Sequence, residues 1–131
     1  IFHKEVLSVK VYIVDDDPDM VVLMTLLLER AGCEVASNAA GSEALPEIAK
    51  FKPDCVLTDL MMAQMDGLEL CRELRKMDTM ADTAVIVVSA RSDDYWRQLA
   101  KDAGAAGYIT KPLDPETFAS QVEGIARHAR A

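Results

Sequence analysis

Five polar side chains stand where short apolar runs of the sequence stop, and their types suit phosphoryl chemistry. Asp15 and Asp16 follow the first of these runs, and Asp59 ends a later one. Ser89 and Lys111 come at the ends of two further runs. Carboxylate oxygens are the hard ligands that Mg²⁺ prefers, and ammonium and hydroxyl groups can bind phosphoryl oxygens. If the five groups meet, Asp15 and Asp16 can hold the metal while Asp59 acts as a nucleophile and becomes an acyl phosphate.

The five groups can meet only if the runs that carry them are strands of one sheet. Short apolar stretches bounded by Pro, Gly or acidic residues are too brief for helices and favour strands. The segments between them carry apolar residues at helical spacing. The pattern predicts strands at 9–14, at 33–36, at 55–57 running on to Asp59, at 85–88 ending in Ser89, and at 108–109 ending at Lys111. It predicts helices from 18 to a turn at Gly32, at 42–50 with a distortion at Pro46, from 67 through Arg75, at 94–103, and from 115 to the C-terminus.

The expected helix ends carry specific signals. Asp17 can accept hydrogen bonds from the first turn of the helix that follows it, and Pro18 suits the first helical position. Gly32 can close that helix in a left-handed turn. Asp114 and Pro115 repeat the first two signals before the last helix. Asp17 is therefore expected to cap a helix rather than to bind a metal.

Strands that alternate with helices predict a doubly wound α/β fold with a five-stranded parallel sheet. A crossover that contains a helix joins parallel strands, and such connections are right-handed. Parallel strands share one carboxyl edge, which is where ligands bind in open sheets of this kind. With 131 residues, half of them apolar, the chain is expected to form a single domain over 1–131.

Charge and composition exclude several classes of partner. The net charge is −8 and Lys and Arg do not cluster, so no direct contact with nucleic acid is expected. No apolar run approaches the roughly 20 residues of a membrane-spanning helix, and the N-terminal residues lack the pattern of a signal peptide. The three cysteines, Cys33, Cys55 and Cys71, are odd in number and form no CxxC pair, which fits a reducing compartment. A cytoplasmic protein without membrane contact is expected.

Four motifs, in this order, resemble those of the bacterial response-regulator receiver domain. They are Val-Asp-Asp-Asp-Pro at 14–18, Leu-Thr-Asp-Leu-Met-Met-Ala-Gln-Met-Asp-Gly-Leu-Glu-Leu at 57–70, Val-Val-Ser-Ala at 87–90, and Gly-Tyr-Ile-Thr-Lys-Pro at 107–112. The resemblance covers almost the whole chain, from about Lys10 to the last helix. It implies a flavodoxin-like (βα)5 fold, like that of the chemotaxis receiver, with strands in the order 2-1-3-4-5.

The resemblance also implies roles for single residues. Asp59 would accept the phosphoryl group, and Ser89 and Lys111 would contact it. Ser89 and Tyr108 would form the switch, because phosphorylation adds acceptor oxygens toward which Ser89 can move, and Tyr108 would then turn inward. The Mg²⁺ ligands would be Asp15, Asp16, Asp59 and the backbone carbonyl of Met61, with Asp16 binding the ion directly.

A phosphoacceptor domain of a two-component or phosphorelay system is the function that the resemblance predicts. A histidine kinase or phosphotransfer protein would supply the phosphoryl group to Asp59, and a downstream effector domain or protein would read the changed surface. The phosphorylated form could also dimerise. Catalysis would be limited to self-phosphorylation and slow autodephosphorylation, so the chain is not expected to be an enzyme. Ala63 and Ala84 depart from the family pattern, in which Pro often stands at these positions.

Two alternatives compete with this prediction. A haloacid-dehalogenase-like phosphatase has motifs that are superficially matched by Asp15, Asp17, Ser89, Lys111 and the pair Asp93-Asp94. That family places its acidic pair after the lysine, whereas Asp93 and Asp94 precede Lys111. Asp59 would also have no role. The other alternative is an interaction module that keeps the fold without being phosphorylated, and it is disfavoured because every chemical position is filled.

Overall fold

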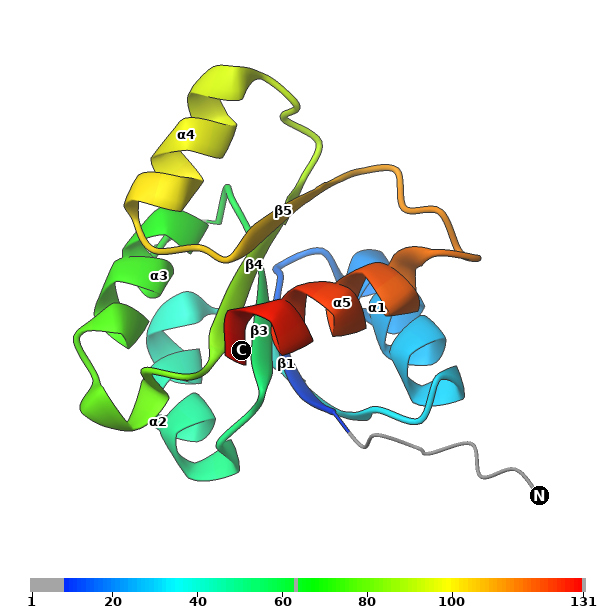
Figure 1. Ribbon diagram of the computed structural model, residues 1–131, viewed down its shortest axis with the longest axis horizontal. Helices are drawn as coiled ribbons and strands as arrows, with labels where there is room; N and C mark the ends of the chain where they lie inside the picture. Colours follow the sequence, from blue (N-terminus) through cyan, green and yellow to red (C-terminus); the bar gives the residue numbers. More distant parts are fainter. Residues whose placement is uncertain (1–8, 63, 131) are drawn as a thin grey trace.

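A five-stranded parallel sheet forms the centre of the molecule, in a computed structural model that describes residues 9–62 and 64–130 (Figure 1). The strands lie in the order β2-β1-β3-β4-β5, which confirms the predicted order. In this part of the chain, no helix is long and apolar enough to cross a membrane. The elements are β1 (Lys10–Val14), α1 (Pro18–Arg30), β2 (Glu34–Asn38), α2 (Gly41–Phe51), β3 (Cys55–Asp59), α3 (Gly67–Arg75), the 3-10 helix η1 (Asp78–Met80), β4 (Ala84–Ser89), α4 (Asp94–Asp102), β5 (Gly107–Thr110) and α5 (Phe118–Arg130).

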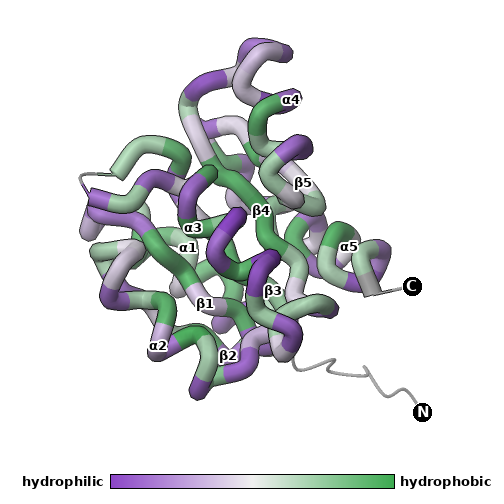
Figure 2. The backbone as a smooth tube through the Cα atoms, turned by 90° about the vertical axis from the view of Figure 1, so that its left-hand side faces the viewer, coloured by the Kyte–Doolittle hydropathy of each residue, from purple (hydrophilic) through white to green (hydrophobic). Residues whose placement is uncertain are grey.

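Helices cover both faces of the sheet and give the domain three layers (Figure 1). α1 and α5 pack on one face, and α2, α3 and α4 pack on the other. Neighbouring residues of a strand point to opposite faces, so Leu57 belongs to the core under α1 and α5 and Val56 to the core on the other side. Because both faces are buried, the central strands are mostly apolar until their carboxyl ends, and Figure 2 shows β4 as a hydrophobic segment.

The start of α1 follows the signals in the sequence. The carboxylate of Asp17 accepts hydrogen bonds from the backbone N–H groups of Asp19 at 3.0 Å and Met20 at 3.4 Å. Pro18 is the first helical residue. Gly32 has a φ of 95°, in the left-handed region that glycine enters without strain. The cap at Asp17 and the proline after it fix the short segment between β1 and α1, which carries two of the predicted site residues, whereas Gly32 closes the other end of the helix, as predicted.

α5 begins later than predicted. Its first residue is Phe118, and the segment from Pro115 forms a turn before it. Asp114 causes this turn: its carboxylate accepts the N–H of Glu116 at 3.0 Å, and its carbonyl accepts the N–H of Phe118 at 2.9 Å. The Asp-Pro pair therefore marks the approach to the helix rather than its first residues.

The bounds of the second and fifth strands also differ from the prediction. β2 extends beyond its predicted end to Asn38, which pairs with Val14. β5 already begins at Gly107, which pairs with Ile86. α2 continues through Pro46, and η1 was not predicted. The added residues belong to the sheet because residues of neighbouring strands pair with them. Such pairing involves distant parts of the chain, so a short stretch of sequence does not reveal it.

Candidate functional site

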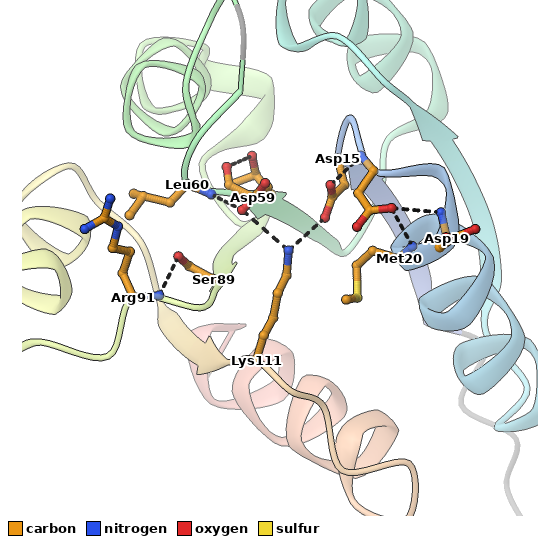
Figure 3. Close-up of polar contacts among 10 residues, drawn as sticks. Asp15, Asp19, Met20, Asp59, Leu60, Ser89, Arg91 and Lys111 are labelled. Carbon is orange, nitrogen blue, oxygen red and sulfur yellow. Dashed lines mark hydrogen bonds and ion pairs between the residues drawn. The ribbon is translucent and has the colours of Figure 1, made fainter.

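Four strands bring a polar side chain to the carboxyl edge of the sheet, as the sequence predicted (Figure 3). Asp15 follows β1, and Asp59 is the last residue of β3. Ser89 is the last residue of β4, and Lys111 follows β5. The pairing of the strands places their ends side by side: Ser89 pairs with Thr110, the residue before Lys111. Residues far apart in the sequence therefore form one polar cluster.

The ammonium group of Lys111 lies between the carboxylates of Asp15 and Asp59 (Figure 3). Its Nζ is 3.3 Å from Oδ2 of Asp15 and 3.6 Å from Oδ1 of Asp59. The side chain of Asp15 is 0% exposed, and those of Asp59 and Lys111 are each 16% exposed. A buried charge is costly unless an opposite charge lies nearby. The ammonium of Lys111 therefore stabilises the carboxylates of both Asp15 and Asp59.

Three carboxylates form a cluster that could hold a metal ion. Asp15, Asp16 and Asp59 each offer an oxygen, and these oxygens all lie within 4.8 Å of one another. Asp15 is buried and Asp16 is exposed, so one side of the cluster is open to water. Mg²⁺ prefers oxygen ligands and usually keeps several waters, and this donor set fits it. Three carboxylates against the single ammonium of Lys111 also leave an excess of negative charge.

Burial raises the pKa of Asp59 above its usual range. Lys111 opposes this effect, because its positive charge favours the ionised carboxylate. The negative charges of Asp15 and, more weakly, Asp16 raise the pKa further. The N–H of Leu60 donates to Oδ1 of Asp59 at 2.8 Å and lowers it. Burial is therefore a larger cause than the repulsion between like charges.

The backbone of Asp59 is closely packed against the start of α3. A Cβ atom on Gly67 would lie 2.3 Å from the carbonyl oxygen of Asp59. The N–H of Gly67 donates to the carbonyl of Leu60 at 3.0 Å. From the sequence, Gly67 indicates only the start of a helix, because this approach arises from tertiary packing. A larger side chain at this position would displace the residue that carries the site.

Ser89 and Tyr108, the two predicted switch residues, are joined through one residue of the loop after β4. Ser89 is buried, at 2% exposure, and its Oγ accepts the N–H of Arg91 at 3.1 Å. The hydroxyl of Tyr108, whose side chain is partly buried, donates to the carbonyl of Arg91 at 2.6 Å. The Ser89 hydroxyl can still donate, because the bond to Arg91 uses only its oxygen. The sequence did not predict this link, since backbone groups carry no sequence signal.

Met61, the predicted backbone ligand, lies two residues beyond Asp59 on the loop after β3, and the residue is 51% exposed. Of the two departures from the family pattern, Ala63 lies outside the described residues. Ala84 is the buried first residue of β4 and pairs with Cys55. Neither position carries a group that takes part in the predicted chemistry.

The remaining acidic residues named from the sequence belong to helix ends. Asp17 caps α1, as predicted. Asp93 is the residue before α4 and Asp94 is its first residue. Both are exposed, so this pair begins a helix on the surface.

Comparisons with known proteins agree with this geometry. The family model for the response regulator receiver domain matches residues 11–123. The chain is 32% identical over 120 residues to the alkaline phosphatase synthesis transcriptional regulatory protein PhoP of Bacillus subtilis, a match that covers 92% of this chain and 49% of PhoP. The Vibrio cholerae chemotaxis protein CheY4 is similar in structure, with a TM-score of 0.86 and 29% identity over 90% of this chain and 98% of that one. The BeF3-activated N-terminal receiver domain of Klebsiella pneumoniae RstA has a TM-score of 0.82 and 30% identity over the same shares.

The family match includes every site residue described above, from Asp15 to Lys111. The chain spans about half the length of the curated relatives it matches. Its acidic cluster is consistent with a phosphoacceptor site. The sheet order, the strand-end residues and the family match lead to one conclusion: the chain belongs to the response regulator receiver domain family of two-component systems.

Proposed function

We propose that Asp59 is the phosphoacceptor of this receiver domain. A carboxylate oxygen of Asp59 attacks the phosphorus atom of a phosphohistidine on a histidine kinase or phosphotransfer protein. The P–N bond breaks as the new P–O bond forms, which leaves an acyl phosphate on Asp59 and the electron pair on the histidine nitrogen. The observation that carries the proposal is the position of this carboxylate at a strand end, with the Lys111 ammonium 3.6 Å away and two further acids beside it.

Lys111 and Ser89 would bind the transferring group. The ammonium of Lys111 can neutralise charge on a phosphoryl oxygen, because Nζ already lies beside Oδ1 of Asp59. The Ser89 hydroxyl retains a hydrogen for donation to a second oxygen. Both contacts would strengthen as negative charge spreads over the phosphoryl oxygens during transfer.

Mg²⁺ would be held by Asp15, Asp16, Asp59 and the backbone carbonyl of Met61. When bound, the ion supplies positive charge to the phosphoryl oxygens. Asp16, the exposed member, is suited to direct binding of an ion that keeps waters. Asp15 also holds Lys111, so its carboxylate serves two functions in the site.

The output is proposed to be a surface that an effector domain or protein reads. Ser89 and Tyr108 both bond to Arg91, so a movement of Ser89 toward a phosphoryl group would disturb the Tyr108 hydroxyl. PhoP is described as a transcriptional regulatory protein, and this chain spans about half of it, which supports an effector region in such proteins. A dimer of the phosphorylated form is part of the same proposal. The net charge of −8 argues against direct contact between this domain and nucleic acid.

We further propose that the domain works in the cytoplasm and is not an enzyme. Its three cysteines are free and buried, which suits a reducing compartment. A phosphoryl group that remains on Asp59 is a signal rather than a released product. The phosphatase alternative needs an acidic pair in the site, but Asp93 and Asp94 lie at the exposed start of α4. The interaction module without phosphorylation remains the alternative that experiment must exclude.

Incubation with a small phosphodonor such as acetyl phosphate tests the proposal. Intact-mass spectrometry should show one added phosphoryl group on the wild type with Mg²⁺, and little with a chelator. Asp59→Asn should show none, while Asp82→Asn, an exposed acid before β4 at the opposite sheet edge, should behave as wild type. Wild-type yield on Asp59→Asn would refute the assignment. No phosphorylation of the wild type would favour the interaction module.

A further inference from the structure

Thr58, which directly precedes Asp59, is a buried polar residue in an apolar part of β3. It is 1% exposed. It pairs with Val14 of β1 and Val87 of β4, and both of these are fully buried. A valine would fill the same space, and a buried hydroxyl is costly unless it forms a hydrogen bond. The hydroxyl of Thr58 therefore needs a hydrogen-bond partner.

The partner is the backbone carbonyl of Asp59. Oγ1 of Thr58 donates to this oxygen at 3.0 Å. The carbonyl shares a peptide group with the N–H of Leu60, and that N–H donates to Oδ1 of Asp59 at 2.8 Å (Figure 3). Because a peptide group is planar, its orientation sets the direction of both its C=O and its N–H. A hydrogen bond at the carbonyl therefore also affects the contact between Leu60 and the carboxylate.

The N–H of Leu60 holds the oxygen of Asp59 that lies beside Lys111. Oδ1 of Asp59 is the atom found 3.6 Å from Nζ of Lys111 (Figure 3). Packing restricts the same peptide group from the side of α3, where a Cβ atom on Gly67 would lie 2.3 Å from the Asp59 carbonyl oxygen. Without the Thr58 hydroxyl, packing alone would hold the peptide group, and the carboxylate would sample more orientations. Fewer of these would suit attack, because transfer depends on the alignment of the reacting atoms.

We propose that Thr58 is a positioning residue for phosphoryl transfer. Its hydroxyl fixes the peptide group between Asp59 and Leu60, and this group orients the carboxylate that attacks the phosphorus atom. Thr58 acts through the backbone rather than as a ligand of the phosphoryl group. The inference rests on the proposed function, because it takes Asp59 as the phosphoacceptor.

Three substitutions separate positioning from stability. Thr58→Val keeps the shape of the side chain and removes the hydroxyl. Thr58→Ser keeps the hydroxyl and removes a buried methyl group. Thr83→Val is the matched control, at the opposite edge of the sheet just before β4. Thr83 is also buried, at 6% exposure, and its hydroxyl donates to the carbonyl of Pro53 at 3.1 Å.

The initial rate of phosphorylation by acetyl phosphate at saturating Mg²⁺, followed by intact-mass spectrometry, measures the effect. Thr58→Val should be phosphorylated about two- to tenfold more slowly than the wild type, the range that corresponds to about one net hydrogen bond. Thr58→Ser should keep the wild-type rate, although the midpoint of its urea unfolding should fall, since it loses buried apolar surface. Thr83→Val should also lower the unfolding midpoint and should leave the rate unchanged.

The amide of Leu60 gives a readout that needs no phosphodonor. In ¹H–¹⁵N spectra of the metal-free protein, Thr58→Val should move the Leu60 amide proton resonance upfield, the direction expected for a weakened hydrogen bond. Thr58→Ser changes the same residue and is the reference for any effect of substitution itself. In Thr58→Ser and in Thr83→Val the resonance should stay close to its wild-type position. A role of Thr58 in stability alone would not produce this difference between Val and Ser.

A wild-type rate of phosphorylation in Thr58→Val would overturn the proposal. An equal loss of rate in Thr58→Val and Thr58→Ser would do the same, as would a Leu60 resonance that is alike in these two variants. Thr58→Ala provides the same comparison with Thr58→Ser if Thr58→Val fails to fold. A wild type that accepts no phosphoryl group would instead contradict the proposed function, and the Leu60 resonance would still decide whether Thr58 orients the peptide group.

Discussion

The Nζ atom of Lys111 lies 3.3 Å from a carboxylate oxygen of Asp15, whose side chain has no exposed surface. This ion pair spans the two sides of the site, from β1 to the end of β5. A buried carboxylate without a partner is costly, so the pair stabilises the metal-free domain as well as placing the ammonium beside Asp59. A metal ion at the same carboxylates would share this role with Lys111.

Lys111→Met should destabilise the metal-free protein by roughly 1–3 kcal/mol, because it leaves Asp15 buried without its cation. Mg²⁺ should stabilise this variant more than it stabilises the wild type, since the ion can replace the lost charge. Urea unfolding with Mg²⁺ and with chelator, at matched ionic strength, gives the four free energies of unfolding. Lys76→Met is the control. The Lys76 side chain is 72% exposed and its partner Glu73 is also on the surface, so the free energy of unfolding should change by less than about 0.5 kcal/mol. An equal loss in both variants would contradict the role of the Lys111 pair.

Asp16→Asn should stabilise the metal-free protein and weaken its response to Mg²⁺. Like charges about 4 Å apart near a protein surface repel by roughly 1–4 kcal/mol, and the exposure of Asp16 places the gain near the lower end. Mg²⁺ stabilises by mass action, so a weaker site gives a smaller shift at the same concentration. Thermal or urea unfolding over a series of Mg²⁺ concentrations measures both effects. An Asn variant that is no more stable in chelator, and gains as much from Mg²⁺, would show that Asp16 is not part of a shared metal site.

Asp59→Asn should be more stable than the wild type in chelator at about pH 7, because burial disfavours the charged carboxylate. The pKa of Asp59 is raised in the folded state, so the folded protein holds this proton more tightly than the unfolded chain does. The stabilisation from that proton is complete below the unfolded pKa of about 3.9 and is lost as the pH rises through the raised folded pKa. The advantage of the Asn variant should therefore shrink as the pH falls toward about 4. Urea unfolding of both proteins across this range tests the sign, and an advantage that grows in acid would contradict it.

Gly67→Ala should destabilise the domain by about 1–3 kcal/mol and lower phosphorylation, because the new Cβ would press against the backbone of Asp59. Gly124→Ala is a matched control in α5, where a Cβ meets nothing within 4 Å. It should instead stabilise the protein by about 0.5–1 kcal/mol through helix propensity. Thermal unfolding and the phosphorylation yield together separate the two substitutions. Similar effects of both would show that the contact at Gly67 is not limiting.

The parallel sheet and the residues at its carboxyl edge could be predicted from local patterns and one rule of topology, whereas the order of the strands came from the resemblance to the receiver family. The apolar runs before Asp15 and Asp59 indicate strands, and parallel strands must share an edge. Once the strands are in place, Asp15, Asp59 and Lys111 have to meet. The cap at Asp17 was predictable for the same reason, since its partners lie within the next turn.

Contacts between distant side chains could not be predicted in this way. Arg97 reads as an ordinary exposed residue of a helix, and only the packing of α4 against β5 brings it to Tyr108 and Thr110. The close approach at Gly67 depends likewise on how α3 packs against β3. The late start of α5 depends on Asp114. An Asp-Pro pair can cap a helix that begins at the proline, or it can form a turn before the helix, as the hydrogen bonds of Asp114 to Glu116 and Phe118 do here. The sequence permits both.

The position of the phosphoryl group tests the central claim most directly. Borohydride reduces an aspartyl phosphate to homoserine, so the wild type can be phosphorylated with a small donor and Mg²⁺, reduced, digested and mapped by tandem mass spectrometry. Homoserine should appear at position 59 of the wild type, and not in protein that was reduced without the donor. Homoserine at Asp15 or Asp16, or a phosphate ester on Ser89 with none at Asp59, would contradict the account.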